Sequence, residues 1–190
     1  MPEHVCPVWV GYLLASPLRK LFQNPGKMLA PYVREGMTVL DIGSAMGFFS
    51  IPMAEMTGPS GKVVCADLQP KMLAVLEKRA RKAGVAGRIV PHLAAGDSLN
   101  LGAYRGAVDF ALASAVVHEV PSAGNLFREV FEVLKPGGVL LVAEPSGHVT
   151  AGAFAKSVAA AERAGFTVRE RAEHSRSLLV VLIKEQGNTL

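Results

Sequence analysis

Cysteine is scarce in this sequence, and the two cysteines present form neither a disulfide framework nor a zinc-binding pattern. Cys65 lies in the apolar run KVVCAD, which predicts a buried thiol within a β-strand. Histidines and acidic residues occur, but none has the close spacing that is typical of metal ligands. We therefore expect no bound metal.

A long hydrophobic run and a strong excess of one charge are also missing. Near the N-terminus the apolar stretch is interrupted by Pro7, Gly11 and Pro17, and no basic segment precedes it, so we expect neither a signal peptide nor a membrane span. The formal net charge of +4 is only mildly basic. The basic run KRARK at 78–82 falls on a predicted helix and is typical of a solvated face. We expect a cytoplasmic protein and disfavour nucleic acid as a partner.

The composition is that of a folded domain. Hydrophobic residues make up 50% of the 190 positions and charged residues 19%, which disfavours extended disorder and allows a sizeable core. No repeat, low-complexity segment or long linker divides the chain. The sequence therefore predicts a single domain over 1–190, with a core at 25–190 preceded by a segment at 1–24.

Apolar, strand-like runs alternate with helical segments along the chain. Predicted strands begin at Thr38 and cover 62–66, 88–93, 107–114 and 139–143, and predicted helices begin near Pro52 and cover 70–83, 125–134 and 151–164. This alternation is typical of a parallel sheet covered by helices on both faces. Two further runs, 167–172 and 177–184, fit an antiparallel hairpin. The predicted fold class is α/β: a doubly wound, Rossmann-like, seven-stranded sheet, mostly parallel, with a C-terminal antiparallel hairpin.

Glycine and proline mark the predicted ends of the helices. Gly84 and Gly165 follow the helices 70–83 and 151–164, and glycine commonly ends a helix in this way. The run Pro136-Gly137-Gly138 is predicted to end the helix 125–134 before the fifth strand begins.

Polar residues follow every predicted parallel strand at its carboxyl end, where open parallel sheets bind ligands. They are Asp41 and Gly43, Asp67, Gly96 and Asp97, Ser114 with His118 and Glu119, and Glu144. An acid at any one of these places could simply cap the helix that follows, but the set as a whole predicts a ligand site. Asp67 lies 20 residues beyond Gly47, a spacing at which a carboxylate accepts hydrogen bonds from ribose hydroxyls.

The loop after the first strand, in VLDIGSAMGFFS, indicates which nucleoside is bound. It has Gly43 and Gly47 but lacks the third glycine of a dinucleotide-binding loop. Asp41 stands two residues before Gly43, and its charge would repel a pyrophosphate. A carboxylate here suits a ligand with positive character, such as an ammonium group beside a sulfonium, and S-adenosylmethionine combines the two.

The order of motifs resembles the class I S-adenosylmethionine-dependent methyltransferases over about residues 25–185. Five stretches carry the resemblance: VLDIGSAMG as the first motif, VVCADLQP as the second-strand acid motif, AAGDSL as the adenine-side loop, VDFALASAVVHEV as the fourth-strand motif, and LKPGGVLLVAEP as the turn and fifth strand common in small-molecule members. The resemblance implies an enzyme that transfers a methyl group from S-adenosylmethionine.

The resemblance also implies roles in cofactor binding. The methionine end would be held by Asp41, Gly43 and Gly47, with Ser114 nearby. Asp67 would bind the ribose hydroxyls, and Leu68 would contact the adenine. Asp97 would receive the adenine amino group, with Gly96 and Ser98 in the same loop. Ala45 departs from the family pattern, which has glycine at this position. We expect Ala45 to be tolerated, and Ala45→Gly to bind the cofactor equally well or more tightly.

Candidates for a proton acceptor follow the fourth and fifth strands. Because a sulfonium is already a strong methyl donor, alignment can supply most of the catalysis and a base is optional. His118 is the first candidate, with Glu119 beside it; Glu144 and His148 are the others. His118 could instead support the site by hydrogen bonding, and His148 is interpreted as a loop histidine that opens the next helix.

The segment 1–24 is the predicted source of acceptor specificity. It is apolar and carries Trp9, Tyr12 and Phe22, so it could close over the acceptor pocket as a lid. A helix that only covers the sheet, or a contact between two copies in a homodimer, explains the same pattern. A lid would favour a small or apolar acceptor.

We therefore expect a methyltransferase that acts on a small molecule. The fourth strand lacks an Asn/Asp-Pro-Pro-aromatic motif, which disfavours amino methylation of DNA bases. A protein or RNA methyltransferase is one alternative, weakly favoured by the positive charge, and a non-catalytic S-adenosylmethionine-binding protein is another. An NAD oxidoreductase fits poorly because of Asp41 and the loop spacing.

Overall fold

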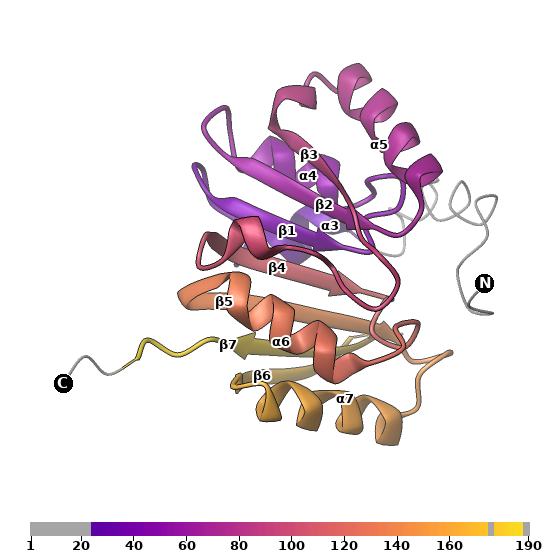
Figure 1. The fold of residues 1–190 in the computed structure, drawn as a ribbon, viewed down its shortest axis with the longest axis vertical. Coiled ribbons are helices and arrows are strands. Elements are labelled where there is room, and N and C mark those ends of the chain that lie inside the picture. Colours follow the sequence, from indigo (N-terminus) through magenta and orange to yellow (C-terminus); the bar gives the residue numbers. More distant parts are fainter. Residues whose placement is uncertain (1–23, 175–176, 188–190) are drawn as a thin grey trace. The chain divides into compact units, whose positions relative to one another are not determined.

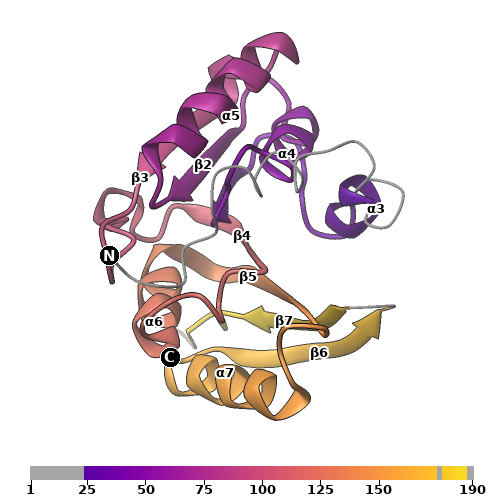
Figure 2. The ribbon, with the colours of Figure 1, turned by 90° about the vertical axis from the view of Figure 1, so that its right-hand side faces the viewer.

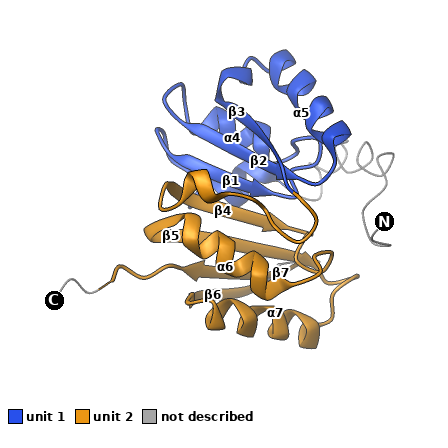
Figure 3. Ribbon diagram, viewed as in Figure 1, with its two compact units in different colours: residues 1–94 blue, residues 95–190 orange. Residues whose placement is uncertain are grey.

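The computed structural model describes residues 24–174 and 177–187. Contacts divide the chain into two compact units, residues 1–94 and residues 95–190 (Figure 3). Each unit is built from strands and helices of its own, and each carries part of the residues named above. The segment predicted as a lid, 1–24, lies outside the described residues except for Asn24.

Unit 1 contains three parallel strands in the order β3-β2-β1 (Figure 1). They are β1 (Thr38–Ile42), β2 (Lys62–Asp67) and β3 (Ile89–Leu93), and the helices are α3 (Pro25–Leu29), α4 (Ser50–Met56), α5 (Pro70–Lys82) and the 3-10 turn η1 (Ala86–Arg88). The middle strand β2 is buried along VVCA because α4 and α5 pack on it. Such burial explains the continuous apolar sequence of this strand.

Unit 2 contains four strands in the order β4-β5-β7-β6. They are β4 (Val108–Ser114), β5 (Leu134–Pro145), β6 (Thr167–His174) and β7 (Ser177–Ile183), with the 3-10 turn η2 (Gly102–Tyr104) and the helices α6 (Ala123–Val133) and α7 (Ala151–Arg163). The two helices pack against each other, and α7 also packs on β7 (Figure 2). β7 is antiparallel to both of its neighbours, β5 and β6.

The strand order β3-β2-β1-β4-β5-β7-β6 confirms the predicted fold class, a mostly parallel seven-stranded sheet with an antiparallel C-terminal pair. The strands agree with the predicted runs to within one or two residues, except at one end of β5. Helix α3 was not anticipated; Pro25 occupies its first turn, and the Asn24 side chain accepts a hydrogen bond from the Lys27 N–H. No helix in the described ranges has the length and apolar character needed to cross a bilayer.

The run Pro136-Gly137-Gly138 lies within β5, although we expected it to separate helix from strand. Val108 pairs with Leu134 and Phe110 with Val139, so the strand bulges between these two pairs. The bulge is held by Lys184, the residue that follows β7: the Gly137 N–H donates to the Lys184 carbonyl at 2.7 Å, and the Lys184 N–H donates to the Gly138 carbonyl at 3.0 Å. Cross-strand hydrogen bonds thus extend the strand through a turn sequence.

Glycine ends α5 and α7 as expected, in the same geometry. Gly84 and Gly165 have φ angles of +73° and +107°. In α5 the Val85 N–H donates to the Ala80 carbonyl at 3.0 Å, and in α7 the Phe166 N–H donates to the Ala161 carbonyl at 3.2 Å. These are Schellman motifs, which require a left-handed residue and so favour glycine.

Candidate functional site

The loop between β1 and α4 has a backbone of alternating conformation. Gly43, Ala45 and Gly47 all have positive φ, at +68°, +46° and +82°. The N–H groups of Gly43 and Ser44 both donate to the Ala66 carbonyl, at 2.9 and 3.1 Å. The loop is therefore bonded to the end of β2, and its conformation is one in which glycine is favoured and alanine is strained.

Asp67, at the end of β2, holds this loop through its side chain. One carboxylate oxygen accepts a hydrogen bond from the Ala45 N–H at 2.8 Å and the other accepts one from the Gln69 N–H at 2.8 Å. A carboxylate can accept about four hydrogen bonds, so the Asp67 side chain retains acceptor capacity for a ligand hydroxyl. Burial raises the pKa of the Asp67 carboxyl, although the backbone hydrogen bonds favour the carboxylate and oppose this shift.

Asp41 lies below the loop, inside unit 1. Its side chain is only 2% exposed and accepts a hydrogen bond from the Ser50 hydroxyl at 2.5 Å. Asp41 pairs in register with Cys65 of β2. The Cys65 side chain is fully buried, which confirms the buried thiol that the sequence predicted. Burial raises the pKa of the Cys65 thiol, and the nearby Asp41 charge raises it further. The Asp41 carboxylate therefore presents little surface for direct contact with a ligand.

Helix α5 supports the loop through Leu76 and through Arg79, whose contact the sequence interpretation missed. A Cβ at Gly47 would lie 3.1 Å from Leu76, so the helix packs closely against this glycine. The Arg79 guanidinium donates to the Met46 carbonyl at 2.5 Å. Arg79 belongs to the run KRARK, which we interpreted as a solvated helix face. Its position next to the buried Ala80 was the sequence feature that could have indicated a contact with the protein.

Ser44 is a further loop residue that the sequence did not single out. Its side chain is 4% exposed, and its hydroxyl is buried without a hydrogen-bond partner. Buried hydroxyl groups normally have a partner, so this one has capacity for a hydrogen bond to a bound molecule. Two other candidates in unit 1, Gly43 and Leu68, are exposed, and the apolar Leu68 side chain is 41% exposed.

In unit 2, the loop after β3 carries Gly96, Asp97 and Ser98. Asp97 is exposed, and Gly96 has a φ of +54° with open space around its Cα. Ser98 is already engaged: its N–H donates to the Ala95 carbonyl at 2.8 Å, and its hydroxyl donates to Glu129 at 3.1 Å. Of the three, Asp97 is thus the residue with an exposed polar side chain.

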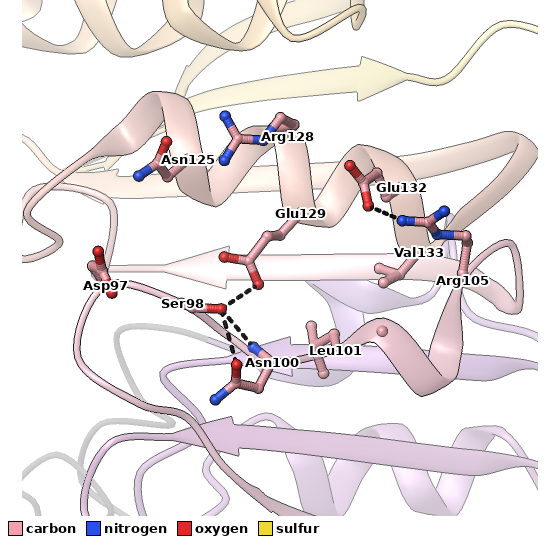
Figure 4. Close-up of a pocket in the computed structure, with 11 residues that line it drawn as sticks. Asp97, Ser98, Asn100, Leu101, Arg105, Asn125, Arg128, Glu129, Glu132 and Val133 are labelled. Carbon is pink, nitrogen blue, oxygen red and sulfur yellow. Dashed lines mark hydrogen bonds and ion pairs between the residues drawn. The ribbon is translucent and has the colours of Figure 1, made fainter.

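Glu129 of α6 fixes this loop and lies at the centre of a polar pocket (Figure 4). The same carboxylate oxygen also accepts the Leu99 N–H at 2.9 Å. The pocket, a cavity of about 450 Å³, is lined by Asp97, Ser98, Asn100, Leu101, Gly102, Arg105, Asn125, Arg128, Glu129, Glu132 and Val133. Acidic and basic side chains are mixed in it, and Arg105 pairs with Glu132 at 2.8 Å.

The residues that follow β4 form a second cluster in unit 2, joined to the end of β5. Ser114 is half-buried, and Ala115 turns the chain with a φ of +54°. Glu144 is 2% exposed and accepts a hydrogen bond from the Val117 N–H at 2.8 Å, and its other carboxylate oxygen lies 2.5 Å from His118 Nδ1. Two residues from different predicted strand ends thus form one pair.

Glu119 and His148 complete this cluster. A Glu119 oxygen lies 3.9 Å from His118 Nε2. The His148 and His118 ring centroids are 6.4 Å apart. His148 is exposed, in a turn that precedes α7, where the sequence predicted it. Across residues 24–174 and 177–187 no group of three or more histidine, cysteine or acidic side chains could hold a metal ion.

A family model described as a methyltransferase domain matches residues 33–181. The chain belongs to this family of methyltransferases. The match confirms the resemblance to methyltransferases that the motifs indicated.

Curated relatives of the methyltransferase align with only part of their own length. The ubiquinone/menaquinone biosynthesis C-methyltransferase UbiE of Pasteurella multocida is 35% identical over 112 residues, which are 59% of this chain and 41% of that protein. An arsenite methyltransferase of Aquipseudomonas alcaligenes is 32% identical over 117 residues, 60% of this chain and 34% of that protein. The chain thus spans less than half the length of these relatives.

A solved structure shows that the methyltransferase fold extends over nearly the whole chain. The crystal structure of a SAM dependent methyltransferase from Aquifex aeolicus superposes with a TM-score of 0.85, at 23% identity, over 95% of this chain and 100% of that one. At this identity the similarity shows the fold alone.

The residues of unit 1 fit the methyl donor. Asp67 has acceptor capacity for a ribose hydroxyl, and the buried Ser44 hydroxyl lacks a partner. The exposed Leu68 offers apolar surface for an adenine ring. These groups match a nucleoside with a polar tail, and the buried charge of Asp41 suits a cationic one better than a pyrophosphate.

Proposed function

We propose that this protein transfers a methyl group from S-adenosylmethionine to a small-molecule acceptor. The observation that carries the proposal is the hydrogen bond between Asp67 and the Ala45 N–H, which joins the glycine loop and the ribose-binding acid into one preformed site. Membership of the methyltransferase family supports it, and so do relatives named for quinone and arsenite methylation.

The residues proposed to bind the cofactor are those named from the sequence, with one addition. Asp41, Gly43, Ala45, Gly47, Asp67 and Leu68 belong to unit 1, and Gly96, Asp97, Ser98 and Ser114 to unit 2. To this set we add Ser44, because its hydroxyl is buried without a partner. Asp67 would hold the ribose, Leu68 and Asp97 the adenine, and the loop the methionine end.

The proposed chemistry needs little beyond alignment and removal of a proton. When bound, S-adenosylmethionine supplies a methyl group on a sulfonium leaving group. His118 is proposed to accept the proton that the acceptor loses, and Glu119 to bind or orient the acceptor beside it. Holding the acceptor in line with the methyl group contributes most of the rate.

We also propose that residues 25–190 act as one methyltransferase domain, because the family match spans both units. Residues 1–24 would form a lid, a packing segment or a homodimer contact. A cytoplasmic location, and the absence of nucleic acid among the partners, remain proposals from composition and charge.

Transfer of a labelled methyl group tests the proposal directly. Purified protein is incubated with methyl-tritiated S-adenosylmethionine and a cell lysate, and label is counted in metabolite, protein and RNA fractions. We expect label in the metabolite fraction, and little of it with Asp67→Ala. Label confined to protein or RNA would show that the methyl acceptor is a macromolecule rather than a small molecule. Binding of S-adenosylhomocysteine without any transfer would indicate a non-catalytic binding protein.

A further inference from the structure

The pairing of His118 with Glu144 has the geometry of a carboxylate that orients an imidazole. Glu144 ends a buried strand, and its side chain is 2% exposed, whereas the His118 side chain is 28% exposed. The carboxylate contacts Nδ1 at 2.5 Å, and Nε2 is the nitrogen away from it. One end of the ring is thus held inside unit 2, and the other end is available at its surface.

Hydrogen-bond chemistry fixes which nitrogen carries the proton. An ionised carboxylate can only accept hydrogen bonds, so the neutral imidazole facing it must be protonated at Nδ1. The Val117 N–H donates to the other Glu144 oxygen at 2.8 Å. Two donors thus compensate a carboxylate that would be costly to bury alone. With the proton on Nδ1, Nε2 carries a lone pair and can accept a proton.

Among the described residues, two carboxylates and a second histidine lie around the His118 ring. Glu144 faces Nδ1, Glu119 lies 3.9 Å from Nε2, which is beyond hydrogen-bond distance, and the His148 ring centroid is 6.4 Å away.

We infer that Glu144 is the positioning residue that makes His118 Nε2 a proton acceptor, and that the methyl acceptor is a hydroxyl-bearing molecule. This inference rests on the proposed function. A neutral hydroxyl is a weak nucleophile and must lose its proton to attack, whereas a thiolate or a free amine can attack without a base. A buried carboxylate behind a histidine is useful in the first case and unnecessary in the second.

The step balances without a further reactant. The hydroxyl proton passes to His118 Nε2, the oxygen forms a bond to the methyl carbon, and the electron pair of the broken carbon–sulfur bond remains on sulfur. The positive charge moves from the sulfonium to the imidazolium, which Glu144 stabilises. Water then takes the proton from His118. Where a carbon conjugated with the oxygen takes the methyl group, the same deprotonation comes first, and the carbon's proton returns to the oxygen through water.

The tautomer of His118 is the first test, because it needs neither cofactor nor acceptor. In ¹⁵N-labelled protein, long-range proton–nitrogen spectra should show His118 protonated at Nδ1 at a pH where the ring is neutral. In Glu144→Gln the amide oxygen can keep the Val117 bond while the amide N–H donates to Nδ1, so the proton should move to Nε2. His148→Gln should leave the His118 tautomer unchanged, and His118→Gln assigns the signals.

An Nε2-protonated His118 in the unsubstituted protein would overturn the inference whether or not Glu144→Gln folds. So would an unchanged tautomer in a folded Glu144→Gln variant. A merely structural Glu144 predicts loss of stability, with the rate of methyl transfer unchanged in a Glu144→Gln variant that is folded.

Methyl transfer is the second test, with the lysate metabolites as acceptors. Glu144→Gln should reduce the rate by about 10²–10⁴-fold, the usual contribution of general base catalysis, with unchanged binding of S-adenosylhomocysteine. The labelled methyl group should lie on an oxygen, or on a carbon conjugated with a hydroxyl; label on nitrogen or sulfur would overturn the acceptor class. Failure to bind S-adenosylhomocysteine would instead refute the proposed function and leave the tautomer result standing.

Discussion

At the scale of single residues, the backbone of Ala45 shows how the loop differs from a glycine-rich one. A φ of +46° is strained for alanine, and the strain is held by the hydrogen bond from its N–H to Asp67. Ala45 is therefore tolerated at an energetic cost, because the surrounding contacts hold its backbone in the strained conformation.

Replacing Ala45 by glycine should relieve this strain. We expect Ala45→Gly to raise the free energy of unfolding by up to about 1 kcal/mol, and to bind S-adenosylhomocysteine equally well or more tightly. Urea denaturation and calorimetry measure the two effects. Ala115→Gly, at a φ of +54°, is the matched control for the stability effect. Clearly weaker binding by Ala45→Gly would show that the methyl group of Ala45 contributes to the site.

Asp67 should make cofactor binding sensitive to mild acid. Burial raises the pKa of this carboxyl above 3.8, so the carboxylate that accepts ribose hydroxyls is lost at a higher pH than for an exposed aspartate. Affinity for S-adenosylhomocysteine should fall as pH decreases through that raised value, by at most about tenfold per pH unit. The stability of the unliganded protein depends on pH in the opposite direction. A raised pKa of Asp67 contributes to the free energy of unfolding at low pH, and this contribution is lost as the pH rises through the pKa of the folded state.

Asp67→Asn separates these effects. It should bind about 10- to 100-fold more weakly at neutral pH, because charge-assisted hydrogen bonds are lost, and its affinity should not vary with mild acid. Glu55→Gln, on the exposed face of α4, should retain the pH dependence of the unsubstituted protein. A pH-independent affinity in the unsubstituted protein would contradict the role of Asp67.

Side-chain pairing is the part of the site that sequence reasoning could not reach. His118 and Glu144 were each named from their position at a strand end, but they are 26 residues apart in the sequence. Hydrogen bonds between separate loops depend on rotamers and backbone turns, such as that at Ala115, which no local pattern encodes. For the same reason the burial of Asp41 and the contact from Arg79 to Met46 were missed.

At the scale of secondary-structure elements, the two Schellman motifs provide a matched pair of glycines. A Cβ at Gly165 would lie 2.8 Å from the Phe131 ring, whereas a Cβ at Gly84 would meet nothing within 4 Å. Gly84→Ala should therefore cost about 1 kcal/mol from the left-handed backbone alone. Gly165→Ala should cost about 2–4 kcal/mol, because overpacking is added. Chemical denaturation measures both, and equal losses would contradict the steric contribution.

Element positions were the most predictable feature, because burial dictates their sequence. Strands such as β2 are apolar throughout, and α5 buries Met72, Leu73, Leu76 and Ala80 at helical spacing. The bulge in β5 was not predictable, since its hydrogen bonds come from Lys184, far along the chain. The run Pro136-Gly137-Gly138 has the composition of a turn, but hydrogen bonds from a distant part of the chain extend the strand through it.

At the scale of the whole molecule, a bound ligand should stabilise the folded chain. S-adenosylhomocysteine at about 100 times its Kd should add about 2.7 kcal/mol to the free energy of unfolding. For a chain of this length that corresponds to a Tm increase of about 5–10 °C. NAD at the same concentration should give no comparable increase. A larger shift with NAD would refute the assignment of the loop, and Asp67→Asn should reduce the shift with S-adenosylhomocysteine.

The burial of the Cys65 thiol has a practical consequence for fluorescence labelling. Its side chain is fully buried, and burial together with the Asp41 charge disfavours the reactive thiolate. A thiol-directed fluorophore should therefore leave Cys65 unlabelled in the folded protein and label it when urea unfolds the chain. The rate of labelling at Cys65 would then report on the opening of unit 1 around β2.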